Sequence, residues 1–365
     1  MEFTAGGRLE VRVTPSDVGK RVSVRQLTEG GKGPEKFTDT VGVLTSWDGG
    51  VLLITRRTGE TVRVPESALV AGKVVPAAPA RRRGPAASFE ELARVCARSW
   101  RPVESEPLGD WLLRASSGFT RRANSVLPLG DPGMPLDEAL ARVRHWYAER
   151  GLPAYIQAAT GAEGTQEVLC AELERRGWRS EVTAEVRVGA LAALADRDVG
   201  LPTDAGLSTD AGLSAVRLDR AVDAAWLRRY QRSAGEPGPE VRQVLGGGQE
   251  PGGGPSVWFA SVPEEGASAA DGPEEGSAEG GGVPAAIGRC AVDGRWAGFM
   301  AVEVGPEYRR RGLATAVMTA LARRALEEGA SAAWLQVEAD NDAARALYDG
   351  MGFAVHHRYH HFRSP

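Results

Sequence analysis

Short runs of alternating apolar and polar residues, separated by glycine-containing turns, make up the first 75 residues. Alternation with a period of two is the pattern of a β-strand that buries one face. Asp48-Gly49 lies between two such runs and is a typical hairpin turn. Five short strands in this length suit a small barrel, so the pattern predicts an SH3-like β-barrel over residues 1–75. The expected strands are Arg8–Val13, Arg21–Leu27, Phe37–Trp47, Val51–Arg57 and Thr61–Val64.

Helical and strand patterns alternate from Ser88 onward, where a typical N-cap precedes an acidic first turn. Such alternation predicts an α/β (α+β) architecture of mixed sheets flanked by helices. Up to about residue 190, the expected elements are strands Trp111–Ala115, Asn124–Leu129, Tyr155–Ala159 and Val182–Val188, and helices Leu136–Arg150 and Glu167–Arg176. The later elements are a helix at Asp219–Ser233, a hairpin at Ile287–Val304 that turns at Asp293-Gly294, then helix, strand, helix and a final strand pair.

Three segments lack the composition of a packed element. Residues 76–87 are rich in Pro, Ala and Arg, residues 203–214 repeat Thr-Asp-Ala-Gly-Leu-Ser twice, and residues 263–282 are acidic and rich in Gly, Ser and Ala. They predict the domain boundaries, which are a barrel over 1–75, a linker over 76–87, an α/β half over 88–190, a linker over 191–214 and a second α/β half over 215–365 with a disordered insert near 263–282.

Composition narrows the functional classes. A chain of 365 residues exceeds one domain of ordinary size, and 42% hydrophobic residues allow a sizeable core. A net charge of −4 gives no basic field, so we expect neither a nucleic-acid nor a membrane partner. Three scattered cysteines suggest no disulfide framework, and no apolar run has the length of a membrane span or a leader. We therefore expect a cytoplasmic protein, with its oligomeric state left open.

The candidate chemistry lies in the last sixty residues. The fragment Arg309-x-x-Gly312-x-Ala314 follows an expected strand and opens an expected helix. Free backbone N–H groups and the positive end of the helix dipole favour an anion there, and Gly312 leaves room for a phosphate to approach. A basic helix start after a glycine turn is the alternative. The downstream segment Asn341-x-x-Ala344-x-x-Leu347-Tyr348 ends in Gly352-Phe353, and its presence favours the anion-binding interpretation.

These two motifs together resemble the coenzyme A site of the GCN5-related N-acetyltransferases (GNAT family), over about residues 215–362. The resemblance implies acetyl-CoA as cosubstrate and no metal. It also implies that the backbone of strand 302–304 pairs with the pantetheine arm, that residues 310–315 hold the diphosphate and that Asn341 bonds the arm. The cofactor-binding set is then Val302, Val304, Arg309, Arg310, Arg311, Gly312, Leu313, Ala314, Thr315 and Asn341.

Two side chains near this site suit proton transfer. Tyr348 would lie beside the sulfur, where a phenol can protonate the leaving thiolate; the alternative is a tyrosine packed against the sheet edge. Glu303 is the nearest carboxylate for removing a proton from an amine, directly or through water, unless it points away or only attracts a cationic acceptor. A backbone N–H near Val304 would polarise the thioester carbonyl.

A weak internal repeat indicates a duplication. Ala154–Gln157 parallels Ala333–Gln336, and in each copy a helix ends in Gly plus an aromatic residue, Gly177-Trp178 and Gly352-Phe353. The first copy carries no arginine cluster, and Leu173 stands where Tyr348 would align. We therefore predict that residues 88–190 are a degenerate GNAT-like half.

The segment around Trp111–Val126 resembles a stretch of actinobacterial proteins that join an SH3-like barrel to tandem acetyltransferase halves, some described as candidate histone acetyltransferases. Arg121, Arg122 and Asn124 are candidates for acceptor binding, with a solvated surface hairpin as the alternative. Four histidines within residues 356–361 suggest a metal site, but strand alternation sends neighbours to opposite faces, so none is expected.

The sequence thus predicts a GNAT-type N-acetyltransferase that acts by direct attack in a ternary complex, because Cys290 lies in neither motif. The acceptor is a primary amine of a protein lysine or N-terminus, or of a small molecule. The alternative from another class is a non-catalytic acyl-CoA sensor or scaffold whose barrel recruits a partner. A nucleic-acid-binding regulator is weaker still, because the basic run Arg81–Arg83 is short.

Overall fold

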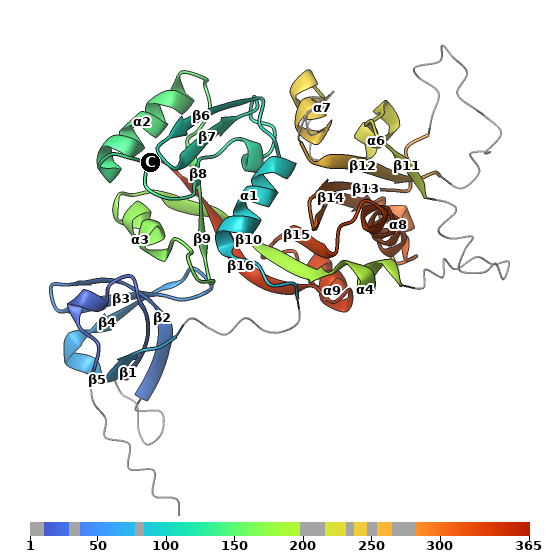
Figure 1. Ribbon diagram of the computed structural model, residues 1–365. Coiled ribbons are helices and arrows are strands. Elements are labelled where there is room, and N and C mark those ends of the chain that lie inside the picture. Colours follow the sequence, from blue (N-terminus) through green and yellow to red (C-terminus); the bar gives the residue numbers. More distant parts are fainter. Residues whose placement is uncertain are drawn as a thin grey trace, which may run out of the picture. The chain divides into compact units, whose positions relative to one another are not determined.

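The computed structural model describes residues 11–28, 37–76, 84–197, 216–230, 237–246, 254–264 and 282–365 (Figure 1). Most of the three predicted linker and insert segments lies outside these residues. The chain forms two units, each discontinuous in sequence. Unit 1 contains Met1–Arg81, Tyr155–Glu185 and His356–Pro365, and unit 2 contains Arg82–Ala154 and Val186–Val355. No helix among the described residues is long and apolar enough to cross a membrane.

The N-terminal part of unit 1 is a five-stranded antiparallel barrel with the order β4-β3-β2-β1-β5. Its strands are β1 (Arg21–Leu27), β2 (Phe37–Asp48), β3 (Val51–Thr55), β4 (Thr61–Pro65) and β5 (Leu69–Val74), with 3-10 turns at Pro15–Asp17 and Glu66–Ala68. The inward residues of the alternating runs form its core, which contains Val13, Val22, Val24, Leu44, Leu52, Ile54 and Val64. The predicted small all-β domain is confirmed.

One barrel strand differs from the expectation. The predicted strand Arg8–Val13 is only a single bridge from Val11 to Gly72 among the described residues, and β5 supplies the fifth strand. The sequence of β5 does not alternate, because a glycine stands at its buried centre. A Cβ on Gly72 would lie 3.1 Å from the Val13 side chain, so glycine lets the N-terminal segment pack closely.

The rest of unit 1 is a strand–helix–strand motif joined by the last strand of the chain. It contains β9 (Tyr155–Thr160), α3 (Glu167–Arg175) and the first part of β10 (Arg179–Ala190). The last part of β16 (Ala354–Arg363) lies between β10 and β9 and pairs antiparallel with β9. A strand from the second α/β half thus completes the sheet of the first half.

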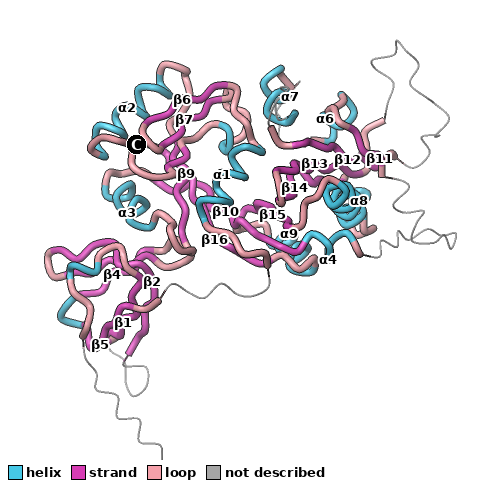
Figure 2. The backbone as a smooth tube through the Cα atoms, in the orientation of Figure 1, coloured by secondary structure: helices cyan, strands magenta, loops and turns pink. Residues whose placement is uncertain are grey.

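Unit 2 is built on a sheet with the order β11-β12-β13-β14-β15-β10 (Figures 1 and 2). Neighbouring strands are antiparallel from β11 to β14, while β14 and β15 are parallel. Residues Val186–Ala190 of β10 belong to this unit, so the first half also contributes a strand to the second. The other bounds are β11 Arg217–Asp219, β12 Ser256–Val262, β13 Ala286–Asp293, β14 Trp296–Val304 and β15 Ala332–Glu338.

Helices cover both faces of this sheet. On one face, α8 (Leu313–Glu327) and α4 (Leu191–Ala195) share a core with alternate residues of β12 to β15. On the other face lie α1 (Phe89–Ser99), α6 (Ala224–Arg229) and α7 (Pro239–Gly246). Trp226 of α6 packs its ring 5.4 Å from that of Phe259, and Trp296 donates to Glu91 of α1 at 2.8 Å. The helix predicted over Asp219–Ser233 is shorter than expected, and residues 231–236 lie outside the described part.

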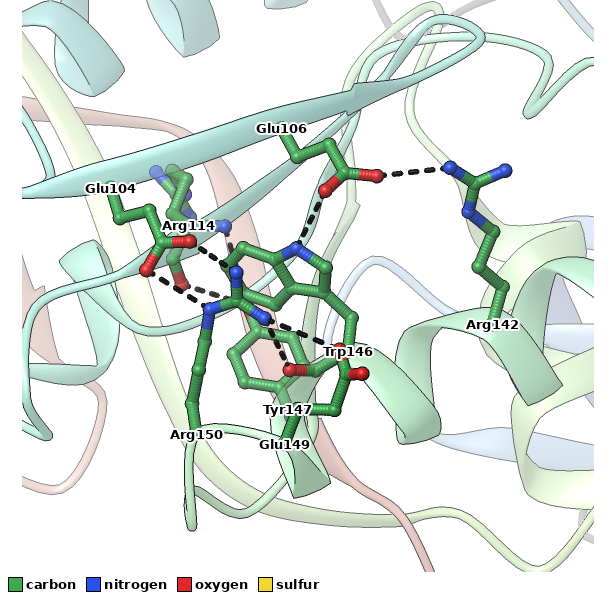
Figure 3. Close-up of polar contacts among 8 residues, drawn as sticks. All are labelled: Glu104, Glu106, Arg114, Arg142, Trp146, Tyr147, Glu149 and Arg150. Carbon is green, nitrogen blue, oxygen red and sulfur yellow. Dashed lines mark hydrogen bonds and ion pairs between the residues drawn. The ribbon is translucent and has the colours of Figure 1, made fainter.

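The remaining part of unit 2 pairs a small sheet with α2 (Leu136–Ala148). The strands β6 (Glu104–Leu108), β7 (Trp111–Ala115) and β8 (Leu127–Pro128) are antiparallel. Figure 3 shows how polar contacts fix the helix: Glu106 accepts from Trp146 at 2.9 Å, and the Arg150 guanidinium lies 3.6 Å from the centroid of the same indole. The strand expected at Asn124–Leu129 is shorter than predicted, because residues 124 and 125 form a bend and β8 contains only Leu127 and Pro128.

The repeat seen in the sequence has a structural counterpart. In each copy a helix ends at a glycine with positive φ, Gly177 (80°) and Gly352 (87°). The following aromatic residue donates its backbone N–H to Leu173 in one copy and to Tyr348 in the other, at 3.0 Å in both. Leu173 therefore occupies the cap position that Tyr348 occupies in the second copy, as the alignment predicted.

Candidate active site

A bulge in β14 begins the site. Ile287 pairs with Glu303 and Arg289 with Met300, so two residues of β14 stand opposite the single Gly288. Ala301, one of these two residues, has a φ of 51°, a left-handed conformation that is uncommon for a residue with a side chain. Such bulges redirect backbone groups beside active sites. Here the bulge changes the direction of the N–H and C=O groups at the carboxyl end of the strand.

The parallel strands β14 and β15 separate at the same level. Their pairing runs from Trp296 with Ala332 to Phe299 with Leu335. Beyond this point β14 continues to Val304 and β15 to Glu338 without further pairing to each other among the described residues. The residues of β14 from 301 to 304 are half-buried. The divergence leaves backbone polar groups available to an extended ligand arm between the two strands.

The turn that follows β14 has the backbone geometry of an anion-binding turn. Arg310 and Gly312 both have left-handed φ angles, 65° and 80°, and Gly312 is the N-cap of α8. The first helical bond recorded at this end runs from Ala316 N–H to Gly312 C=O, so the N–H groups of the first turn have no acceptor within the helix. Alternating left-handed residues gather successive N–H groups into an anion-binding concavity. Arg309 and Arg311 are exposed on the same turn.

A buried arginine braces this turn. Arg229 of α6 donates from Nε to the Pro284 carbonyl at 2.6 Å and lies 3.3 Å from the Glu307 carboxylate. A Cβ on Gly305 would lie 2.8 Å from the Arg229 guanidinium, so glycine is required for this approach. The Tyr308 hydroxyl donates to Glu264 at 2.8 Å. These contacts fix the path of the chain from β14 into α8.

Tyr348 lies on α9 (Asp342–Gly350), beside the core under α8. Its ring is half-buried and meets the Phe353 ring edge-on at 6.1 Å, and Phe353 meets Phe299 at 6.5 Å. The buried Arg187 of β10 holds the helix through a 2.7 Å ion pair with Asp349. Packing and an ion pair thus fix the direction of the tyrosine.

Asn341 has a structural role that sequence reasoning did not assign. Its Oδ1 accepts from Ala344 N–H at 3.1 Å, which makes it the N-cap of α9. The side chain is exposed at this helix start. The cap occupies the oxygen only, so a bond from its amide nitrogen to a cofactor arm stays a prediction.

Glu303 points to the face opposite α8. Val302 and Val304 pack against the core under α8, and strand alternation then places Glu303 on the other face. Gln336 and Glu338 of β15 lie on that same face, because Leu335 and Val337 belong to the α8-side core. Sequence reasoning missed both, since only strand pairing places them next to β14. The Gln336 Oε1 is buried and has no hydrogen-bond partner among the described residues, so it could accept a hydrogen bond from a ligand.

The family follows from sequence comparison. A family described as "Probable histone acetyltransferase Rv0428c C-terminal" matches residues 87–362, and its "Rv0428c N-terminal Sm-like domain" matches residues 16–73. The chain belongs to this acetyltransferase family. The expected GNAT-type acetyltransferase is thereby confirmed, and the barrel is the domain that this family calls Sm-like.

Several individual proteins are similar to this chain. The "Probable histone acetyltransferase Rv0428c" of Mycobacterium tuberculosis is 34% identical over 139 residues, which are 38% of this chain and 43% of that protein. The "Uncharacterized N-acetyltransferase YobR" of Bacillus subtilis is 24% identical over 75% of this chain and 97% of its own. A solved GCN5-related N-acetyltransferase from Kribbella flavida has a TM-score of 0.47 and 15% identity, over 76% of this chain and 97% of that chain.

The three acceptor-binding candidates of this acetyltransferase differ in their surroundings. Asn124 is buried, and its amide is fully engaged: Oδ1 accepts from the Ser116 and Gly118 N–H groups, and Nδ2 donates to two backbone carbonyls. It organises the turn itself. Arg122 is buried with its guanidinium 5.7 Å from the centroid of Trp100, and Arg121 is exposed. Acceptor binding by these residues stays a prediction.

The three cysteines are buried, and a histidine of the C-terminal run is held by hydrogen bonds within the protein. Burial raises the pKa of Cys290 to about 12, and the other two cysteines are also buried with raised pKa values. In the C-terminal run, His360 bonds the Thr160 hydroxyl at 3.0 Å and the Thr183 hydroxyl at 2.8 Å. Within the described residues, no group of three or more His, Cys, Asp or Glu side chains is placed to hold a metal ion.

Proposed function

We propose that this protein is an acetyl-CoA-dependent N-acetyltransferase that transfers the acetyl group to a primary amine by direct attack in a ternary complex. The proposal is supported by the order of the backbone features along the chain from β14 to α8. The bulged end of β14 leads, through a braced turn, into amides that are arranged for an anion at the start of α8. An acyl-CoA has the matching order of groups, since a thioester and an amide-containing arm precede its diphosphate.

The diphosphate fits the α8 turn better than a single charged side chain would. The amides of residues 310–315 and the positive end of α8 favour a compact anion. The solvent-exposed side chains of Arg309 to Arg311 add positive charge. We assign the pantetheine amides to the free edge of β14 at Val302 and Val304, because β15 no longer pairs there. Asn341 would complete the contacts with the arm through its amide nitrogen.

The reaction requires two proton transfers. The amine nitrogen attacks the thioester carbonyl carbon, the C–S bond breaks, the nitrogen loses a proton and the thiolate gains one. We assign proton removal from the amine to Glu303, which lies on the face opposite α8, and protonation of the thiolate to Tyr348, which lies beside the α8-side core. The buried thiols support direct attack, because an acyl-enzyme would need an accessible thiolate.

For the acceptor we propose an amine of a protein, a lysine or an N-terminus, with a small-molecule amine as the second choice. The name of the Mycobacterium tuberculosis relative supports the first. We also propose that residues 88–190 have kept the fold without the cofactor, because Leu173 stands at the cap position of Tyr348. The domain boundaries given above belong to this proposal.

Two measurements test the function. Calorimetry with acetyl-CoA should show binding, and thiol release should follow when a panel of amines and basic proteins is added. Mass spectrometry of cell extract with isotopically labelled acetyl-CoA then identifies the acceptor. Binding without thiol release from any amine would favour an acyl-CoA sensor, and absence of binding would remove both assignments.

A further inference from the structure

Arg289 is completely buried, and within the described part of the chain its two terminal nitrogens have no oxygen acceptor. It lies on β13, and Nε donates to the Leu245 carbonyl of α7 at 2.5 Å. Its Nη1 contacts only the Met300 sulfur, at 3.1 Å, and Nη2 has no partner. A thioether is a weak acceptor. The side of the guanidinium that normally binds a carboxylate with two parallel bonds is therefore unsatisfied.

Among the residues that the structure describes, no carboxylate pairs with this guanidinium. Its neighbours are the Trp100 ring, whose centroid is 5.5 Å from the guanidinium carbon, and the neutral Tyr230 and Cys290. Burial lowers the pKa of Arg289 to about 10, so the side chain stays charged at neutral pH. A buried charge of this kind is unfavourable unless it is paired. Such a group in a native structure calls for an explanation, and a ligand that supplies the missing partner is one.

Its position in the sheet is next to the proposed chemistry. Arg289 pairs with Met300, and the next pair on the same face is Ile287 with Glu303, roughly 7 Å further along the strand. The β14 bulge lies between these two pairs. Arg289 thus shares the face of the proposed base, away from α8 and from the phosphate turn.

The surroundings of Arg289 include the turn that the sequence singled out. Arg122 lies over the same Trp100 ring as Arg289, with guanidinium-to-centroid distances of 5.7 Å and 5.5 Å. Phe119, from the same turn, meets the ring of Tyr230 at 6.2 Å. The turn that contains Phe119 and Arg122 thus contacts the same aromatic rings that surround the Arg289 side chain.

We propose that the Arg289 guanidinium binds a carboxylate of the acceptor, and that the acceptor is an amine whose own molecule carries a carboxylate a few bonds away. Free amino acids and the first residues of acidic peptides have this chemistry. The Met300 sulfur contacts Nη1, and because this side chain is unbranched and flexible, it can move aside for an oxygen ligand. This inference rests on the proposed acetyltransferase function and specifies its substrate class.

The test compares acceptors that differ only in the carboxylate. One pair is an amino acid and its carboxamide; the other is a peptide with Glu at its start and the same peptide with Gln. For the wild type, kcat/KM should be higher for the carboxylate of at least one pair, and the pair concerned distinguishes a free amino acid from a peptide. In Arg289→Met this preference should fall by about 10- to 100-fold, the loss expected for hydrogen bonds to a charged group. Comparing ratios between enzymes cancels differences in amine basicity.

Arg114→Met is the matched control. Arg114 is also buried in unit 2, but it donates to the carbonyl and the hydroxyl of Ser125, so its nitrogens serve the fold. Its loss should lower stability and leave the acceptor preference unchanged. Arg289→Lys keeps the positive charge but cannot form two parallel hydrogen bonds to a carboxylate, so it should retain part of the preference. This variant provides the test if Arg289→Met does not fold.

Three outcomes separate this inference from the function on which it rests. Turnover of amines with equal kcat/KM for carboxylate and carboxamide in the wild type overturns the inference and leaves the acetyltransferase standing. A preference that survives in Arg289→Met and Arg289→Lys also overturns it. If no acceptor is turned over, the proposed function fails; calorimetric binding of the amino acid to the wild type but not to Arg289→Met would still support the carboxylate site, and equal or absent binding would exclude it.

Discussion

Replacing Tyr348 by phenylalanine separates the chemistry of this residue from its packing. The ring meets Phe353 edge-on at 6.1 Å, and the interplanar angle is 69°, so a phenylalanine ring can keep the same contact. The side chain is half-buried beside the α8-side core, and its backbone carbonyl forms the helix cap in either case. We therefore expect Tyr348→Phe to change the free energy of unfolding by less than about 1 kcal/mol.

The rate should change far more. A positioned general acid typically contributes about 100- to 10,000-fold. We expect kcat for thiol release from acetyl-CoA to fall at least 100-fold in Tyr348→Phe, which corresponds to about 2.7 kcal/mol of transition-state stabilisation at 1.36 kcal/mol per tenfold. The Kd for acetyl-CoA should stay within about twofold, because the phosphate turn is unchanged.

The leaving group supplies a sharper assay. An acetyl thioester of a more acidic thiol needs no proton at the sulfur, so it should recover most of the lost rate in Tyr348→Phe. Tyr155→Phe is the control, since that hydroxyl donates to Glu181 at 2.8 Å in unit 1. Its removal should affect stability and leave kcat unchanged. If Tyr348→Phe keeps more than a third of kcat, or if the better leaving group gives no recovery, the acid role is wrong.

Three further predictions concern the turn, the base and the histidines. Gly312→Ala should weaken acetyl-CoA binding about tenfold by calorimetry, because a turn that relieves roughly 1–2 kcal/mol of strain by leaving the φ of 80° no longer directs its amides at the diphosphate. Gly329→Ala, with a φ of 90° beyond the other end of α8, carries similar strain away from this turn and should lose stability without a change in Kd. Glu303→Gln should lower kcat about 10- to 100-fold at neutral pH and recover at alkaline pH, where the amine deprotonates unaided, and a larger effect in Glu338→Gln would transfer the base role to β15. Burial lowers the pKa of His360 to about 4, so only the unfolded chain takes up this proton between about pH 6.5 and 4. As the pH decreases through that window, the free energy of unfolding should therefore decrease, by about 2 kcal/mol at pH 5. Urea titrations of His360→Gln should show a smaller decrease.

Local features were predictable from the sequence. The turn into α8 depends on consecutive residues, and a positive φ at Gly312 is what glycine permits at a helix start. The Asp293-Gly294 hairpin also formed where its residues indicated, between Asp293 and Trp296. The equivalence of Leu173 and Tyr348 followed from spacing to a glycine, because the cap geometry is local.

Features that depend on distant residues were not predictable. The surroundings of Arg289 are formed by Leu245 on α7, Trp100 after α1 and Met300 on β14. No spacing rule relates these positions in the sequence. The full engagement of the Asn124 amide arises from a turn whose residues gave only a polar signal. Strand β5 was missed because its pattern does not alternate.

The exchange of β10 and β16 constrains how this chain can evolve. Residues Val186–Ala190 extend the sheet of the second copy, and His356–Arg363 stand between strands of the first. Deleting either copy would remove a strand from the other and expose an unpaired edge, which invites aggregation. The copy that we propose has lost the cofactor is therefore still required, because its strand completes the sheet of the other copy.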